Sequence, residues 1–215
     1  RREKMSDILN EISTALQKGK SKQVKQLVPQ ALEEGIPAQQ ILDEALLAGM
    51  GIIGELFKND EVFVPEVLVA AKAMNAGVAI LQPYLADGEN QVKGKCVIAT
   101  VKGDLHDIGK NLVKMMMEGK GIEVIDMGND VPAEDIVAKA KEENAQIIAL
   151  SALITTTMRE MASVVEAAEA AGIRDQVKIM VGGAPVTEEF AKAIGADIYT
   201  SDAATAADVA AELLA

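Results

Sequence analysis

The first 88 residues carry apolar side chains at the spacing of amphipathic helices. In four segments, apolar residues recur three or four positions apart, which places them on one face of a helix. Proline is favoured in the first turn of a helix and glycine at its end, so Pro37, Pro65 and Gly35 give boundaries for the last two helices. The pattern predicts a four-helix bundle over residues 1–88. Its apolar sets are Ile8, Ile12 and Leu16; Val24, Leu27, Val28 and Ala31; Ile41, Leu42, Ala45 and Leu46; and Val67, Leu68, Ala71 and Met74.

A different pattern follows the polar, glycine-bearing segment 85–95, which we interpret as a linker and a hinge. Short apolar runs alternate with amphipathic stretches, which indicates βαβ units and a parallel sheet covered on both faces. We predict that residues 89–215 form a flavodoxin-like, doubly wound α/β domain with five parallel strands in the order 2-1-3-4-5. The runs are CVIATV (96–101), IEVIDM (122–127), IIALSAL (147–153), KIMVGG (178–183) and DIYT (197–200).

Composition narrows the classes of partner. The chain has 21 Lys and Arg against 33 Asp and Glu, a formal charge of -12, which disfavours attraction to nucleic acid. We find no run of about 18 apolar residues, so no membrane partner is expected. The first residues, RREKMSDILNEIS, do not resemble a signal peptide, and the single Cys96 excludes an intrachain disulfide framework. A cytoplasmic location is expected.

The single histidine, His106, lies in VKGDLHDIGKNLV (101–113), directly after the first predicted strand. Ligands of a doubly wound sheet bind beyond the carboxyl ends of strands 1 and 3, where the loops at 151–157 and 182–183 should also converge. One His and one Cys do not make a conventional zinc site, and no serine lies in a G-x-S-x-G turn. A macrocycle already supplies four nitrogens to its metal, so one histidine would suffice as axial ligand. A packing histidine in a turn is the alternative.

Three motifs carry a family resemblance. Residues 103–109 (GDLHDIG), 151–153 (SAL) and 182–183 (GG) resemble the D-x-H-x-x-G, S-x-L, G-G signature of corrinoid-binding domains, the vitamin B12 modules of methionine synthase and its relatives. Residues 50–74 resemble the helical cap that precedes this domain in methyl-carrying members. The whole chain is most similar to the two-domain corrinoid proteins of methanogen and acetogen methyltransferase systems.

The resemblance implies a cobalamin or related corrinoid, methylcobalamin in the loaded state. His106 would be the lower axial cobalt ligand in place of the benzimidazole, and Asp104 would accept a hydrogen bond from its other nitrogen. Thr157 would continue this relay, where methionine synthase has a serine. The sequence Thr-Met-Arg-Glu at 157–160 also fits a capping box, a role compatible with the relay.

Further cofactor contacts follow from the same resemblance. Gly109 would open a helix beginning at Lys110, where a side chain would narrow the slot for the nucleotide tail. An ordinary strand-to-helix turn is the alternative for the two glycines of the G-G motif, and helix packing is the alternative for those of the cap. The expected tail contacts are Ser151, Leu153, Thr155, Gly182 and Gly183, and the expected upper-face contacts are Met50, Gly51, Gly54, Leu56 and Phe57, with Leu56 or Phe57 as the shield.

The implied function is a methyl shuttle. The protein would accept a methyl group from a substrate-specific methyltransferase and present it to an acceptor methyltransferase, with a reductive activation protein as third partner. Without a second large domain for donor or acceptor, we expect a corrinoid subunit rather than a complete enzyme. A B12-dependent regulator or light sensor and the small subunit of a carbon-skeleton mutase are the alternatives, and an FMN carrier or receiver domain is weaker. Methylamines, methanol, methoxylated aromatics, thiols and betaines all remain open as donors.

Overall fold

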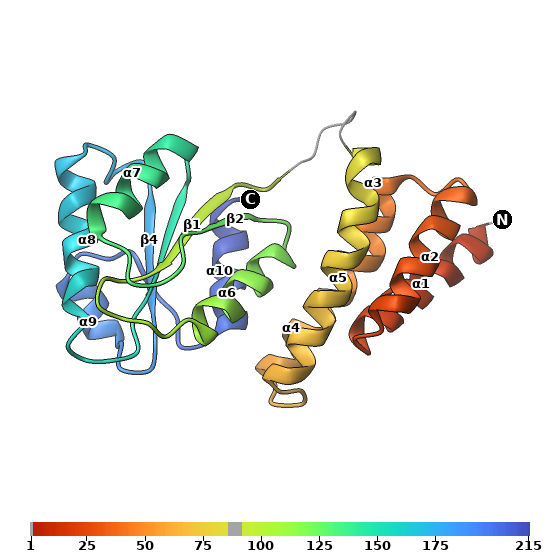
Figure 1. Cartoon of the computed structure of the whole chain (residues 1–215), viewed down its shortest axis with the longest axis horizontal. Helices are drawn as coiled ribbons and strands as arrows, with labels where there is room; N and C mark the ends of the chain where they lie inside the picture. Colours follow the sequence, from red (N-terminus) through yellow and green to blue (C-terminus); the bar gives the residue numbers. More distant parts are fainter. Residues whose placement is uncertain (1, 86–91) are drawn as a thin grey trace. The chain divides into compact units, whose positions relative to one another are not determined.

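The computed structural model describes residues 2–85 and 92–215, with side chains described from residue 7 onward. The chain divides into two compact units. One is helical and the other holds the β-sheet (Figure 1). The predicted boundary between residues 88 and 89, with most of the predicted linker, lies outside the described residues.

The helical unit contains the four helical segments expected from the apolar spacing. They are α1 (Arg2–Gln17), α2 (Ser21–Glu33), the unbroken succession α3 (Ala38–Ile41), η1 (Leu42–Leu47) and α4 (Ala48–Lys58), and α5 (Val64–Leu85). The π-helical turn η1 was not predicted. Pro37 directly precedes α3, and Pro65 is the second residue of α5, as expected for a residue without an N–H donor.

Helix α5 is the one described helix with the length and apolar character of a membrane span, with a mean hydropathy of 1.5. We expected no such segment, because the sequence has no run of about 18 apolar residues. In the structure α5 packs against α2 and α4. Its buried residues include Val67 and Met74, as in a helix of a bundle.

The second unit confirms the predicted sheet. Its five parallel strands lie in the order β2-β1-β3-β4-β5. Thr100 at the end of β1 is level with Ser151, and Ser151 with Gly182, so the loops of interest leave the same edge. The strands are β1 (Lys95–Thr100), β2 (Glu123–Asp126), β3 (Ile147–Ser151), β4 (Lys178–Gly182) and β5 (Ile198–Tyr199).

Helices cover both faces of the sheet, which explains why its strands are apolar on both sides (Figure 1). On one face lie α6 (Ile108–Glu118) and α10 (Ala203–Leu213), and on the other α7 (Ala133–Glu143), α8 (Arg159–Ala170) and α9 (Glu188–Ala193). Val97, Ile148 and Ile179 are fully buried beneath the second set. This packed core makes the sheet a rigid base for the loops at its carboxyl edge.

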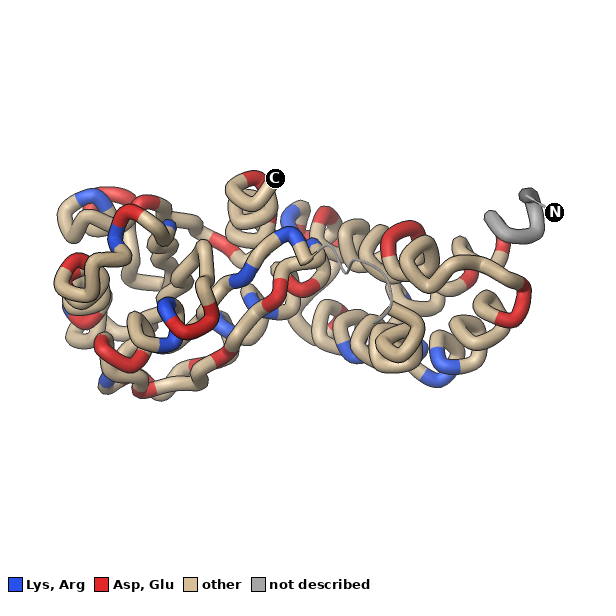
Figure 2. Tube along the Cα trace, turned by 90° about the horizontal axis from the view of Figure 1, so that it is seen from above, with Lys and Arg blue, Asp and Glu red and all other residues tan. Residues whose placement is uncertain are grey.

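Charged residues are distributed over both units. Figure 2 shows acidic residues on the helices of each unit, with basic residues interspersed rather than gathered in a stripe. Such a surface offers no extended basic track for a phosphate backbone among the described residues.

Candidate functional site

The loop after β1 turns sharply and leads directly into α6. Gly103 has a φ of 80°, which glycine adopts without steric cost. The N–H of Asn111 donates to the carbonyl of Asp107 at 2.8 Å, so the helix begins at Ile108. The predicted start at Lys110 was therefore two residues late. Gly109 lies within the first turn of the helix rather than before it.

Asp104 is the centre of the hydrogen-bond network in this loop. Its side chain is fully buried. One carboxylate oxygen, Oδ1, accepts from the His106 ring Nδ1 at 2.8 Å and from the His106 backbone N–H at 3.1 Å. The other, Oδ2, accepts from the Thr157 hydroxyl at 2.7 Å and the backbone N–H groups of Leu153 and Ile154 at 2.8 and 3.4 Å. Through these hydrogen bonds the buried Asp104 carboxylate joins the loop after β1 to the loop after β3.

The same contacts keep Asp104 ionised. Burial acts to raise the pKa of this carboxyl group. The hydrogen bonds from Leu153, Thr157 and His106 outweigh burial and hold the pKa well below its usual range. An ionised carboxylate accepts but does not donate, so the Nδ1 of His106 must carry the proton of this bond.

His106 is thereby oriented with one nitrogen free for a ligand. Its Nδ1 is bound to Asp104, while the side chain is 54% exposed. In the neutral imidazole the remaining nitrogen, Nε2, holds the lone pair, and this is the form that binds a metal. The hydroxyl of Thr100, at the end of β1, donates to the His106 carbonyl at 2.9 Å and fixes the main chain as well.

Thr157 takes part in this network and not in a capping box. Helix α8 begins at Arg159, and its cap residue, Met158, makes no side-chain cap bond. The Glu160 N–H donates to the Thr157 backbone carbonyl at 3.0 Å, and the Thr157 hydroxyl donates to Asp104 instead of accepting from Glu160. The capping-box interpretation was therefore wrong, whereas the contact expected between the hydroxyl and Asp104 is present.

Four exposed apolar side chains lie in or directly next to the two joined loops. Leu105 and Ile108, on either side of His106, are 69% and 73% exposed. Leu153 and Ile154, whose N–H groups bind Asp104, are 43% and 41% exposed. Large apolar residues gathered on a surface indicate a binding site. Only Leu153 was predicted, although apolar residues beside the single histidine of a loop were a usable signal.

The glycines near the carboxyl edge of the sheet differ in how much space the chain leaves for a Cβ atom. A Cβ atom on Gly109 would meet no protein atom within 4 Å, so packing within the chain does not require glycine there. Gly183 has a φ of 134°, and its Cβ would clash with the Ala152 carbonyl oxygen. Its alternative role, an ordinary tight turn after a strand, therefore has a steric basis in the chain itself. A Cβ on Gly182 would lie 3.3 Å from the Thr200 carbonyl oxygen.

The other predicted tail contacts lie at the same edge of the sheet. Ser151 is the last residue of β3 and is half-buried, and Thr155 is exposed in the loop that follows. Ser151 pairs with Gly182 in the sheet register. The three motifs of the sequence signature thus meet at one edge of the second unit.

The five residues predicted to contact the upper face of a corrin all lie in α4 of the helical unit. Met50 and Gly54 are buried, and Gly51, Leu56 and Phe57 are half-buried. A Cβ on Gly51 would meet nothing within 4 Å outside its own helix, which gives no support to close helix packing as the reason for this glycine. Contact between these residues and a cofactor stays a prediction.

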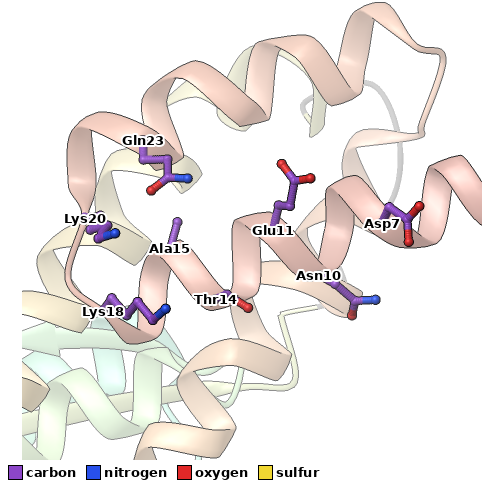
Figure 3. Close-up of a pocket in the computed structure, with 8 residues that line it drawn as sticks. All are labelled: Asp7, Asn10, Glu11, Thr14, Ala15, Lys18, Lys20 and Gln23. Atoms are coloured by element: carbon purple, nitrogen blue, oxygen red, sulfur yellow. The ribbon is translucent and has the colours of Figure 1, made fainter.

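A separate hollow of about 450 Å³ lies between α1 and α2. Figure 3 shows Lys18 and Lys20 toward one end of it and Asp7 toward the other, with Glu11 extending into the space between the helices. It contains none of the predicted site residues. Its lining is polar and open to solvent, so we assign it no role in the chemistry at His106.

The loop after β2 is hydrogen-bonded to the histidine loop, a contact that we did not predict from the sequence. The Asp130 carboxylate accepts from the Gly103 N–H at 2.7 Å, and the Asp130 N–H donates to the Asp104 carbonyl at 3.0 Å. The Asn129 amide donates to the Leu105 carbonyl at 3.1 Å. Asp130 adopts a φ of 55°, which is unusual for a residue other than glycine. The turn-forming sequence Gly-Asn-Asp at 128–130 was the available signal.

Comparisons with known proteins find matches to both units of the chain. Residues 94–211 match the B12 binding domain family, and residues 8–82 match a second family with the same description. The chain is 43% identical over 213 residues to dimethylamine corrinoid protein 3 of Methanosarcina acetivorans, covering 98% of this chain and 100% of that protein. It is 46% identical over 180 residues to trimethylamine corrinoid protein 1 of Methanosarcina mazei, covering 83% of each.

Among solved structures, the chain is similar to one in the methanol:cobalamin methyltransferase complex MtaBC from Methanosarcina barkeri. The TM-score is 0.89 at 30% identity, covering 97% of this chain and 80% of that one.

Proposed function

The chain belongs to the family of B12-binding corrinoid proteins, and from this premise we propose that it is the methyl-carrying subunit of a methyltransferase system. In this role it accepts a methyl group from a substrate-specific methyltransferase and presents it to an acceptor methyltransferase. The observation that carries the proposal is the buried Asp104, which orients His106 and leaves its Nε2 free among exposed apolar side chains.

The residues at the sheet edge fit a corrinoid. No group of three or more His, Cys, Asp or Glu side chains among the described residues could hold a metal ion by itself. A single imidazole suits a metal whose equatorial positions are already filled by a macrocycle. The open space at Gly109 and the apolar side chains of Leu105 and Ile108 suit a large, flat ligand with a tail. When bound, the corrinoid supplies the cobalt centre on which the methyl group is carried.

The chain's own contribution is to hold His106 and to control its proton. His106 would hold the metal through Nε2, while Asp104 would accept a hydrogen bond from Nδ1 and raise the basicity of the ring. Thr157 donates to Asp104 from the side opposite His106 and so stabilises the ionised carboxylate. Through its hydrogen bond to Nδ1, Asp104 would keep the ring proton on that nitrogen.

The methyl donor that we propose is a methylamine. Relatives named as dimethylamine and trimethylamine corrinoid proteins share 43% and 46% identity with this chain, against 30% for the chain in the methanol complex. The partners are then a methylamine-specific methyltransferase, an acceptor methyltransferase and a reductive activation protein. Within the helical unit, Leu56 and Phe57 of α4 are the candidates to shield the methyl-bearing face.

Reconstitution with defined methyltransferases tests this proposal. The corrinoid-loaded, reduced chain is mixed in separate reactions with a methyltransferase specific for dimethylamine, trimethylamine or methanol and its substrate, and methylation of the bound corrinoid is followed by visible absorption. We expect methylation with an amine enzyme and little with the methanol enzyme. Methylation by the methanol enzyme alone would overturn the donor assignment. Tighter binding of adenosylcobalamin than of methylcobalamin would favour the mutase alternative over the shuttle.

A further inference from the structure

A buried lysine lies close to the histidine loop and has no part in the site described so far. Lys110, in the first turn of α6, has a side chain that is only 1% exposed. A buried ammonium group is costly unless it is paired and hydrogen-bonded. Its Nζ lies 2.6 Å from the Asp126 carboxylate and 2.8 Å from the Asn111 amide oxygen. Such a buried pair holds two elements of the unit in one arrangement.

Asp126 extends this pair into the turn after β2. The carboxylate oxygen that meets Lys110 also accepts from the Gly128 N–H at 2.9 Å. Burial acts to raise the pKa of Asp126, but the hydrogen bonds from Lys110 and Gly128 and the Lys110 charge lower it below its ordinary value. Lys114 approaches the other oxygen at 3.4 Å from a more exposed position. Asp126 therefore remains an ionised anchor for both the helix and the turn.

The turn after β2 is connected to His106 by two hydrogen bonds of Thr100. The Gly128 carbonyl accepts from the Thr100 N–H at 2.9 Å. The fully buried Thr100 uses its hydroxyl to donate to the His106 carbonyl, also at 2.9 Å. At the other end of the loop, α6 begins at Ile108, only two residues after His106. The ion pair is thus connected to both sides of the histidine.

We propose that the Lys110–Asp126 ion pair, acting through the Gly128 turn and Thr100, is a positioning element that fixes the main chain at His106 and so strengthens the hold this residue would have on cobalt. The proposal rests on the proposed function, because it assumes that His106 is the axial ligand. Groups that orient a metal ligand without touching the metal commonly change metal affinity 10- to 100-fold when they are removed. Loosening this connection should therefore weaken the hold of His106 on cobalt while leaving corrinoid in the protein.

The single histidine allows a direct test. In protein labelled with ¹⁵N-histidine and loaded with cob(II)alamin, coordination by His106 gives a two-line nitrogen splitting in the EPR spectrum. Added ¹⁴N-imidazole that replaces His106 gives three lines. The imidazole concentration that displaces half of the His106 signal is compared among wild type, Thr100→Val, Lys110→Met and the matched control Lys114→Met. Circular dichroism establishes that each variant is folded.

We expect the half-displacing concentration to fall about ten-fold in Thr100→Val and Lys110→Met and to stay at the wild-type value in Lys114→Met. Wild-type values in Thr100→Val and Lys110→Met would overturn the proposal. An equal fall in Lys114→Met would also overturn it, because loss of positive charge would then explain the effect. If Lys110→Met does not fold, Asp126→Asn replaces it, since asparagine keeps an oxygen for the Gly128 N–H but removes the carboxylate charge that pairs with Lys110. An unchanged concentration in that variant would equally contradict the proposal. A wild-type spectrum without the two-line splitting would instead refute the proposed function.

Discussion

Replacement of Thr157 by valine tests the hydrogen bond that the buried Thr157 hydroxyl donates to Asp104. Valine keeps nearly the same shape but lacks the hydroxyl that donates to Asp104 at 2.7 Å. The site is buried, so water does not replace the lost donor easily. Asp104 keeps the two N–H groups of His106 and the backbone N–H of Leu153. The variant therefore removes one donor from a carboxylate that stays partly satisfied.

The expected cost follows from that geometry. A hydrogen bond to a charged group contributes about 1.5–3 kcal/mol, and the remaining donors place this one near the lower end. We expect Thr157→Val to lower the free energy of unfolding by about 1.5 kcal/mol, or the midpoint of thermal unfolding by about 3–6 °C. Loss of the donor should also raise the pKa of Asp104, because less now stabilises its ionised form.

Urea unfolding followed by circular dichroism measures this effect, with Thr157→Ser as the matched control. Serine keeps the hydroxyl and loses only a methyl group, which should cost less than about 1 kcal/mol. A valine variant within about 0.5 kcal/mol of wild type would refute the assignment of the hydroxyl as a donor to Asp104. A serine variant less stable than the valine variant would show that the methyl group, and not the hydroxyl, is what matters at this position.

Three further predictions concern other features of the second unit. Because the folded-state pKa of Asp104 lies below the unfolded value of about 3.9, its ionised form stabilises the fold at neutral pH and this contribution is lost in acid. The stability difference between wild type and Asp104→Asn, measured by urea unfolding, should thus shrink as the pH falls below about 4; a constant difference would contradict this. Gly109→Ala should leave the apoprotein as stable as wild type, or up to about 1 kcal/mol more stable, but should weaken corrinoid retention. Gly183→Ala should instead destabilise the apoprotein, because Gly183 has a φ of 134° and a Cβ there would clash with Ala152. Burial raises the pKa of Cys96 to about 12, so a thiol reagent at pH 8 should react only after unfolding, and rapid labelling of the native protein would contradict the buried position.

The sheet could be predicted well from the sequence because its central strands, β1, β3 and β4, are buried on both faces. Each apolar run marked a strand to within two residues. The switch in strand order between β1 and β3 predicted that the candidate site lies at the loops after these strands. Local choices were harder to predict. The π-helical turn at 42–47 leaves the apolar spacing nearly unchanged, and the start of α6 at Ile108 depends on a hydrogen bond from Asn111 to Asp107.

The candidate site was predicted where a sequence motif was available and missed where only tertiary contacts define it. Asp104 and His106 belong to one short motif, so their contact could be expected. The roles of Thr100, Asp126 and Asp130 depend on hydrogen bonds between the loops after β1 and β2. The same sequence allows these residues ordinary roles in strands and turns, so no local pattern separates them from their neighbours.

The central claim is that His106 is the axial ligand of a bound corrinoid, and the visible absorption spectrum tests it most directly. The wild-type chain and His106→Ala are each refolded with hydroxocobalamin, desalted and compared. We expect wild type to retain a stoichiometric corrinoid whose benzimidazole has been replaced by His106, and the variant to lack this spectral form. Wild type without corrinoid after desalting, or a variant spectrum identical to that of wild type, would contradict it.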